Sequence, residues 1–159
     1  MDALLDLLKK NARESSETLA KQLDTSAENV DSQIRDLQDQ GIIRAFQAIV
    51  NEDKLSSNYV HAVIELRIRP QHDGGFDSIA DRIGRFEEVE SMFLMSGAYD
   101  LLLFVKGSSL QDVAGFVSSR LSNINGVLST ATHFMLKTYK DQGVLMEGEN
   151  NDKRLQVCP

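Results

Sequence analysis

Side chains capable of acid–base, nucleophilic or metal chemistry are few and scattered in this sequence. The three histidines, His61, His72 and His133, are far apart and lack metal-ligand spacing. No glycine-rich phosphate loop, zinc-binding helix motif or nucleophile elbow occurs. The single cysteine, Cys158, lies one residue from the C-terminus and can form neither an internal disulfide nor a cysteine-based metal site. The sequence therefore predicts a protein that is not an enzyme and has no metal and no cofactor.

Two of the histidines could nonetheless lie close together in the folded chain. His61 and His133 both fall in segments that read as strands, and those strands could be neighbours in one sheet. They are then either part of a site or two partly exposed strand residues, and the sequence leaves both interpretations open.

Composition restricts the partners and the compartment. The net charge is −7 and the sequence pI is about 4.9, which by itself argues against nucleic acid, because lysine and arginine drive phosphate binding by releasing counterions. Apolar and charged contents of 42% and 26% are ordinary for a globular chain. The start lacks a signal-peptide pattern, and no apolar run approaches the length of a membrane span. We therefore expect a cytoplasmic protein without a membrane partner.

The first half of the chain, residues 1–50, has the periodicity of three short helices followed by an extended segment. After a leucine-rich first helix, a second is predicted over 17–22 and a third from the N-cap Ser26 to about Gln40, with Gly41 ending it. Residues 42–50 are β-branched and extended. Two helices across a tight turn and a strand ribbon are the parts of a winged helix-turn-helix, although an inert three-helix bundle has the same periodicity.

The second half reads as a ferredoxin-like domain over residues 59–143, between a polar linker at 51–58 and a mobile tail at 144–159. Strands and helices alternate in the order βαββαβ, so the predicted fold class is α+β. The strands are expected at 59–69, 89–95, 101–105 and 127–136, and the helices at about 76–84 and 108–121. Because two helices cover one face of such a sheet, the other face favours pairing with a second copy of the chain.

Several short motifs, in this order and spacing, resemble the Lrp/AsnC family of transcription regulators. They are 7–13, Leu19-Ala20, the apolar set Val30, Ile34 and Leu37, Gly41-Ile42-Ile43, 86–91, 97–102 and 126–132. The resemblance covers nearly the whole chain, to about Gly143. It implies a regulator whose third helix is the recognition helix in the major groove of double-stranded DNA.

The resemblance implies DNA contacts from the third helix and the segment that follows it. The candidates are Ser26, Asn29, Ser32, Gln33, Arg35 and Arg44. Asparagine and glutamine suit adenine edges, and arginine suits phosphate. The helix departs from the family pattern, because it has Gln33 where a basic residue is usual. It carries four acidic residues (Glu28, Asp31, Asp36, Asp39) against one base (Arg35), a net charge of −3. The sequence leaves two outcomes open for this helix. It either binds DNA weakly and with low salt sensitivity, or it has lost DNA binding.

The resemblance also implies an amino-acid effector site at a Gly-x-x-Asp turn between dimers. The candidates are Gly97, Ala98, Tyr99 and Asp100, with Ser129, Thr130 and Thr132 as opposing polar groups. Backbone amides beside glycine can hold an α-carboxylate, and Asp100 can accept a hydrogen bond from an α-ammonium. A plain hairpin turn, with glycine for positive φ and aspartate capping its own backbone, is the alternative.

The sequence thus predicts a DNA-binding transcription regulator that responds to a small metabolite, an amino acid by resemblance. By the same resemblance the chain forms a homodimer, and dimers can group into octamers. The alternative is a ligand-sensing oligomeric protein whose acidic winged helix no longer binds DNA.

Overall fold

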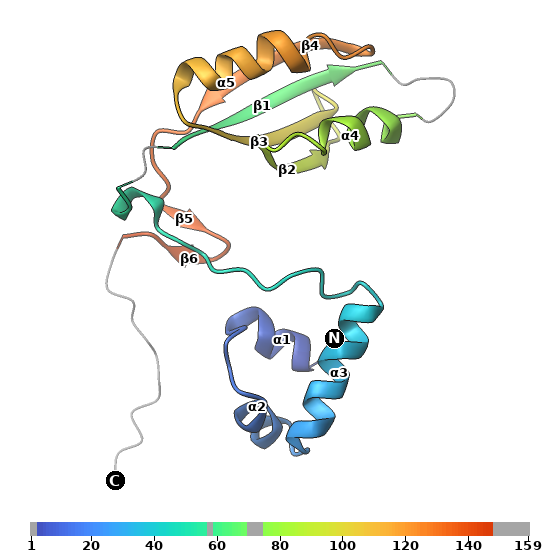
Figure 1. The fold of residues 1–159 in the computed structure, drawn as a ribbon, viewed down its shortest axis with the longest axis vertical. Coiled ribbons are helices and arrows are strands. Elements are labelled where there is room, and N and C mark those ends of the chain that lie inside the picture. The colour runs from blue at the N-terminus through green and yellow to red at the C-terminus, as the bar shows by residue number, and fades with distance from the viewer. Residues whose placement is uncertain (1–2, 57–58, 70–74, 148–159) are drawn as a thin grey trace. The chain divides into compact units, whose positions relative to one another are not determined.

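The computed structural model describes residues 3–56, 59–69 and 75–147 of the 159 residues. The chain forms two compact units, Met1–Val50 and Asn51–Pro159 (Figure 1). Within the described residues, no helix is long and apolar enough to cross a membrane.

The first unit consists of three helices with well-formed ends, α1 (Ala3–Lys10), α2 (Ser16–Leu23) and α3 (Ala27–Asp39). Ser15 caps α2 and Ser26 caps α3, each hydroxyl accepting a backbone N–H three residues on. At the end of α3, Gly41 has φ +70° and donates to the carbonyl of Gln38, while Ile42 donates to that of Leu37. This pair of bonds is a Schellman motif, which ends the helix where the glycine allows a left-handed residue.

The core of the first unit is a small apolar cluster that all three helices share. Its buried members are Leu4, Leu8, Leu19, Ala20, Val30 and Leu37. Their burial fixes α3 with its opposite side exposed to solvent, since helical residues spaced by three or four share one side.

The strand ribbon predicted over 42–50 is wrong for the described chain. Residues 44–50 have no strand assignment, and Ile42, Phe46, Ile49 and Val50 are exposed. The residue types favour extension, but a strand forms only where a neighbour completes its hydrogen bonds, and the described residues offer this segment none.

The second unit is a four-stranded antiparallel sheet with two helices, in the strand–helix–strand–strand–helix–strand order predicted, which confirms a mixed α+β fold. Its main elements are β1 (Val60–Ile68), α4 (Asp77–Ile83), β2 (Val89–Leu94), β3 (Leu101–Gly107), α5 (Leu110–Phe116), a π-helical turn η2 (Val117–Leu121) and β4 (Val127–Phe134). The strand order in the sheet is β2-β3-β1-β4.

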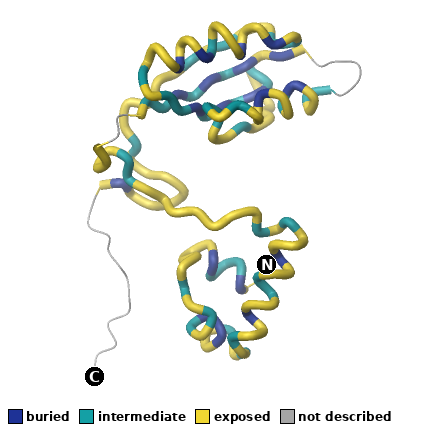
Figure 2. Tube along the Cα trace, in the orientation of Figure 1, coloured by how far each residue is buried: buried dark blue, intermediate teal, exposed yellow. Residues whose placement is uncertain are grey.

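One face of this sheet carries the core. Every second residue of the two central strands is buried there, Ala62, Ile64 and Leu66 on β1 and Leu101, Leu103 and Val105 on β3. Figure 2 shows the buried positions along the chain trace. Residues of α4 and α5 cover them, among them Ile79, Ile83, Val113 and Phe116. The odd-numbered residues of β1 therefore lie on the other face, away from α4 and α5.

The ends of this unit depart from the predicted boundaries. The tail was predicted to start at 144, but Val144–Leu145 form β6, paired with β5 (Lys140–Asp141). Gln142 and Gly143 both have positive φ, +42° and +91°, as a tight two-residue hairpin turn requires. Residues 148–159 lie outside the described residues, as does most of the Asp73-Gly74-Gly75 turn. Part of the predicted linker is also ordered, because Glu52–Lys54 form a 3-10 turn, η1, within the second unit.

Candidate functional site

The Gly-x-x-Asp turn between β2 and β3 is fastened to the end of β1. The Asp100 carboxylate accepts the backbone N–H of Ile68 at 2.8 Å, and the Asp100 N–H donates to the Leu66 carbonyl, also at 2.8 Å. The carbonyl of Asp100 closes the turn by accepting from Met95. Gly97 has φ +153°, a conformation that side-chain-bearing residues rarely adopt. Asp100 therefore shapes the turn through both its backbone and its side chain.

The fastened turn borders a hollow of about 150 Å³ on the sheet face away from α4 and α5. Its lining comes from β1, from the turn and from β4, and consists of Glu65, Arg67, Ala98, Tyr99, Ser129, Thr130 and Ala131. Arg67 links two of these segments, because its Nε donates to the Ala98 carbonyl at 2.7 Å. The hollow thus combines one cation, one anion, a tyrosine and the hydroxyl-bearing Ser129, while Thr130 pairs with the buried Leu66 and borders the hollow from the backbone of β4.

Four of the seven predicted effector residues line this hollow, Ala98, Tyr99, Ser129 and Thr130. The other three, Gly97, Asp100 and Thr132, are not among its lining residues. Thr132 pairs with the buried Ile64, and cross-strand partners share a face, so Thr132 belongs to the helix-covered side. The polar residues of β4 do not form one surface, because strand alternation divides them between two faces.

Two charged residues of the hollow, Glu65 and Arg67, were missing from the predicted site. Their position on the polar face of the first strand was visible in the sequence. What the sequence did not contain was the β1–β4 register, which sets Arg67 opposite Ser129 and Glu65 opposite Ala131. Only that register and the fastened turn bring these side chains around one space.

Helix α3 carries most of the predicted DNA-binding residues. Its outward side, opposite the buried Val30 and Leu37, presents Glu28, Ser32, Arg35 and Asp39 at spacings of four, three and four. The Ser26 hydroxyl is occupied as the N-cap. This outward side contains two acids and one base, so it is less acidic than the helix as a whole.

The remaining residues predicted to contact DNA differ in their exposure and in their hydrogen bonds. Asn29 is exposed, and its Nδ2 donates to Thr25 Oγ1 at 2.7 Å, while Gln33 is half-buried. Arg35 is exposed, with Nε donating to the Asp31 carbonyl at 3.2 Å. Arg44 is exposed beyond the end of the helix. Arg35 is the one basic residue of α3, and it lies on the outward side.

Comparison with known proteins decides the family. Residues 61–145 match the Lrp/AsnC ligand binding domain. An HTH-type transcriptional regulator of Bacillus subtilis, YugG, is 41% identical over 157 residues, which cover 98% of this chain and 95% of that protein. The chain belongs to the Lrp/AsnC family. The family and this relative are transcriptional regulators and not enzymes, which confirms the predicted family and regulatory function.

Solved structures of Lrp/AsnC regulators have the same fold. A transcriptional regulator of Neisseria meningitidis in complex with L-methionine superimposes with a TM-score of 0.70 at 25% identity, covering 89% of this chain and 93% of that one. AsnC of Escherichia coli gives a TM-score of 0.68 at 22% identity, covering 91% of this chain and 97% of the other.

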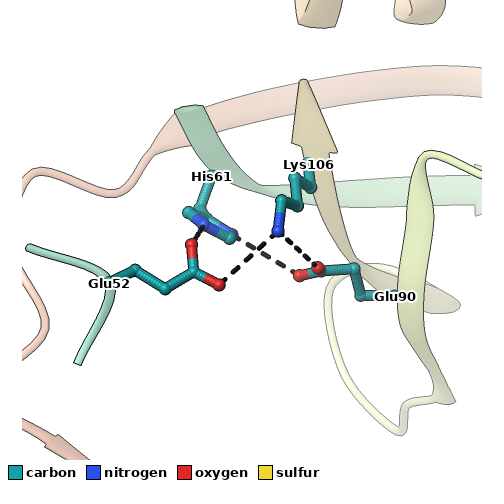
Figure 3. Close-up of polar contacts among 4 residues, drawn as sticks. All are labelled: Glu52, His61, Glu90 and Lys106. Carbon is teal, nitrogen blue, oxygen red and sulfur yellow. Dashed lines mark hydrogen bonds and ion pairs between the residues drawn. The ribbon is translucent and has the colours of Figure 1, made fainter. Parts of the chain in front are cut away.

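A second charged group of this Lrp/AsnC chain lies where β1 begins. His61 Nε2 is 2.7 Å from Glu52 Oε2, and His61 Nδ1 is 3.4 Å from Glu90 (Figure 3). Lys106 Nζ reaches the same two carboxylates at 3.5 and 3.9 Å, and it lies 3.9 Å from the centre of the Tyr59 ring. The cluster holds η1, which begins the second unit, against the first three strands of the sheet.

The two strand histidines do not form a common site. His133 lies opposite Val63 and 3.4 Å from Glu65, whereas His61 pairs with Glu52 and Glu90. Within the described residues, no three histidine, cysteine or acidic side chains are placed to hold a metal ion. Both histidines act in this structure as partners of carboxylates.

Acidification should weaken the cluster around Glu52. The hydrogen bond with His61, aided by the charges of His61 and Lys106, lowers the pKa of Glu52 below its ordinary value of 4.5. A lowered carboxylate pKa stabilises the folded chain above the unfolded-state value, and this contribution disappears as the pH falls through the folded-state pKa. Glu52→Gln should therefore lower the midpoint of urea unfolding at pH 7, and the difference from wild type should shrink below pH 4.5.

The matched control is Glu87→Gln, an exposed carboxylate without an ion pair among the described residues. It should change the midpoint little at either pH. If the difference in urea midpoint between Glu52→Gln and wild type stays constant from pH 7 to pH 3, the lowered pKa of Glu52 does not stabilise the fold.

Proposed function

We propose that this Lrp/AsnC regulator binds a free amino acid in the hollow beside the Gly-x-x-Asp turn and that binding changes its affinity for DNA. The observation that carries this proposal is the composition of the hollow, because Arg67, Glu65, Tyr99 and Ser129 all line one small space. Small-molecule sites characteristically place a few polar groups around a concavity. The related Neisseria meningitidis regulator was solved with L-methionine, which makes an α-amino acid the natural first ligand to test.

In this proposal α2 and α3 form a helix-turn-helix, and α3 enters the major groove. Arg35 and Arg44 would contact phosphates, while Asn29, Ser32 and Gln33 would face base edges. Because Glu28 and Asp39 flank Arg35 on the outward side, each docked helix would gain little from phosphate contacts. DNA affinity would then depend on the α3 helices of two copies acting together in an oligomer. We expect this regulator to act in the cytoplasm.

The sheet face away from α4 and α5 supports the dimer in this proposal. Phe93 is 52% exposed there and packs edge-on against Phe104. Apolar side chains such as these are stabilised when a second sheet covers them. The extended residues 44–50, which carry exposed apolar side chains and lack a strand partner among the described residues, offer a second contact between copies. Dimers grouping into octamers remain a prediction from the family.

The deciding experiment is fluorescence anisotropy of the full chain with the duplex upstream of its own coding sequence. It is run at low and moderate salt, with and without the twenty L-amino acids. Saturable binding that an amino acid alters would support the regulator. An absence of binding at low salt, where phosphate attraction is strongest, would favour a ligand sensor that has lost DNA.

Replacing Arg35 by alanine should weaken binding to that duplex at every salt concentration. Loss of one phosphate contact from each helix should reduce the slope of log affinity against log salt by about one per site. The reciprocal change, Asp39→Asn, should strengthen binding because it removes a charge that repels phosphate. Arg82→Ala, which removes an exposed arginine from α4 in the other unit, is the matched control and should leave the affinity unchanged. Equal affinities of Arg35→Ala and wild type would reject α3 as the recognition helix.

A further inference from the structure

We propose that Arg67 and Glu65 of β1 select a zwitterion, with Arg67 binding the α-carboxylate and Glu65 the α-ammonium of the effector. The inference rests on the proposed effector site and assigns its two charged contacts. It differs from the prediction made from the turn motif, which gave these roles to backbone amides and Asp100.

The guanidinium of Arg67 is held in place and still has donors to spare. Its Nε donates to the Ala98 carbonyl at 2.7 Å, which orients the group beside the turn. Arg67 lines the hollow. Within the described residues, its two terminal nitrogens have no hydrogen bond or ion pair. A planar guanidinium with free terminal N–H groups is the side chain best suited to a carboxylate.

Glu65 provides the opposite charge on the same face of the strand. One oxygen, Oε1, lies 3.4 Å from His133 Nε2, and the side chain keeps 36% of its surface exposed. Its other oxygen has no partner within the described residues. A carboxylate in this setting can accept hydrogen bonds from an ammonium group.

The spacing of the two charges fits an α-amino acid. Residues two apart on a strand are separated by about 6.8 Å, and both side chains then point to the same face. Glu65 and Arg67 form no ion pair with each other in the structure, so a space lies between the two charged ends. A molecule whose ammonium and carboxylate share one carbon would join them across that space, whereas a simple amine or a simple acid would engage only one.

Asp100 is less suited to the ammonium role. Its Oδ2 already accepts the Ile68 amide, and Asp100 is not a lining residue of the hollow. The structure therefore gives Asp100 the role of positioning the Ala98 carbonyl, to which Arg67 is bound.

The test measures which charged group of the ligand each residue recognises. The full wild-type chain is first screened against the twenty L-amino acids by thermal shift. For the best binder, affinities are measured by calorimetry for the amino acid, its α-carboxamide and its N-acetyl derivative, which each lack one charge. The same three ligands are then titrated into Arg67→Gln, Glu65→Gln and the control Arg82→Gln.

Wild type and Arg82→Gln should bind the carboxamide and the N-acetyl derivative at least about tenfold more weakly than the amino acid, because each analogue lacks one charge-assisted contact. Arg67→Gln should lose this preference for the free carboxylate, and Glu65→Gln the preference for the free ammonium. A merely misplaced turn would instead weaken all three ligands by a similar factor.

Two results would overturn the inference in distinguishable ways. If Arg67→Gln and Glu65→Gln keep the wild-type preferences, other groups bind the two charges, and the effector site itself stands. If no amino acid shifts the wild-type chain, the proposed effector function fails and the inference fails with it. Circular dichroism of each variant tests whether a lost preference comes from unfolding.

Discussion

Replacing Leu103 by alanine should lower the free energy of unfolding of the second unit by about 2–5 kcal/mol. Leu103 is fully buried at the middle of β3, opposite Ile64 on β1 and Met92 on β2. Truncation removes apolar contacts and leaves a cavity beneath α4 and α5, which the regular sheet cannot close.

Urea unfolding followed by far-UV circular dichroism measures this effect. The control is Leu128→Ala on β4, because Leu128 is 58% exposed and its truncation should change the stability by less than about 0.5 kcal/mol. Similar losses for the two variants would mean that the covered face of the sheet is not the core of this unit.

Replacing Asp100 by alanine should both destabilise the second unit and abolish the response to amino acids. The change leaves the backbone N–H of Ile68, a residue 4% exposed, without its acceptor, and a buried donor left unpaired costs about 1–3 kcal/mol. The turn would also lose its side-chain attachment to β1, so the Ala98 carbonyl would no longer hold Arg67 at the hollow.

Asp100→Asn distinguishes this positioning role from direct binding of the ammonium group. Its amide oxygen can still accept from Ile68, so it should keep most of the stability and the amino-acid affinity, despite losing the negative charge. Thermal unfolding and calorimetric titration of the three proteins measure both properties. If Asp100→Asn binds as poorly as Asp100→Ala while remaining as stable as wild type, the charge of Asp100 contacts the ligand directly.

The sequence alone determined the local elements of this protein. Serine at Ser15 and Ser26 and glycine at Gly41 fixed the ends of α2 and α3, because capping needs only a few neighbouring residues. The strict alternation of residues 60–68 predicted β1 and its buried face, because alternation also depends only on neighbouring residues. The motifs and their order were enough to identify the family.

Two failed predictions have different physical causes. The apolar residues at 42–50 have strand-like types, but the described chain offers them no partner strand. The tail prediction missed β6, because each strand of this hairpin is only two residues long, too short for an alternating pattern to be recognised beside the turn at Gln142 and Gly143.

The tertiary structure decided which charged residues complete the candidate site. Thr132 was predicted for it and faces the helices, whereas Glu65 and Arg67 were not predicted and line the hollow. A strand fixes which residues share a face, but only pairing with its neighbour fixes which residues meet, and a register shift of one residue would exchange the faces. The β1–β4 register and the attachment of Asp100 to β1 thus turn a set of ordinary polar residues into one small charged hollow.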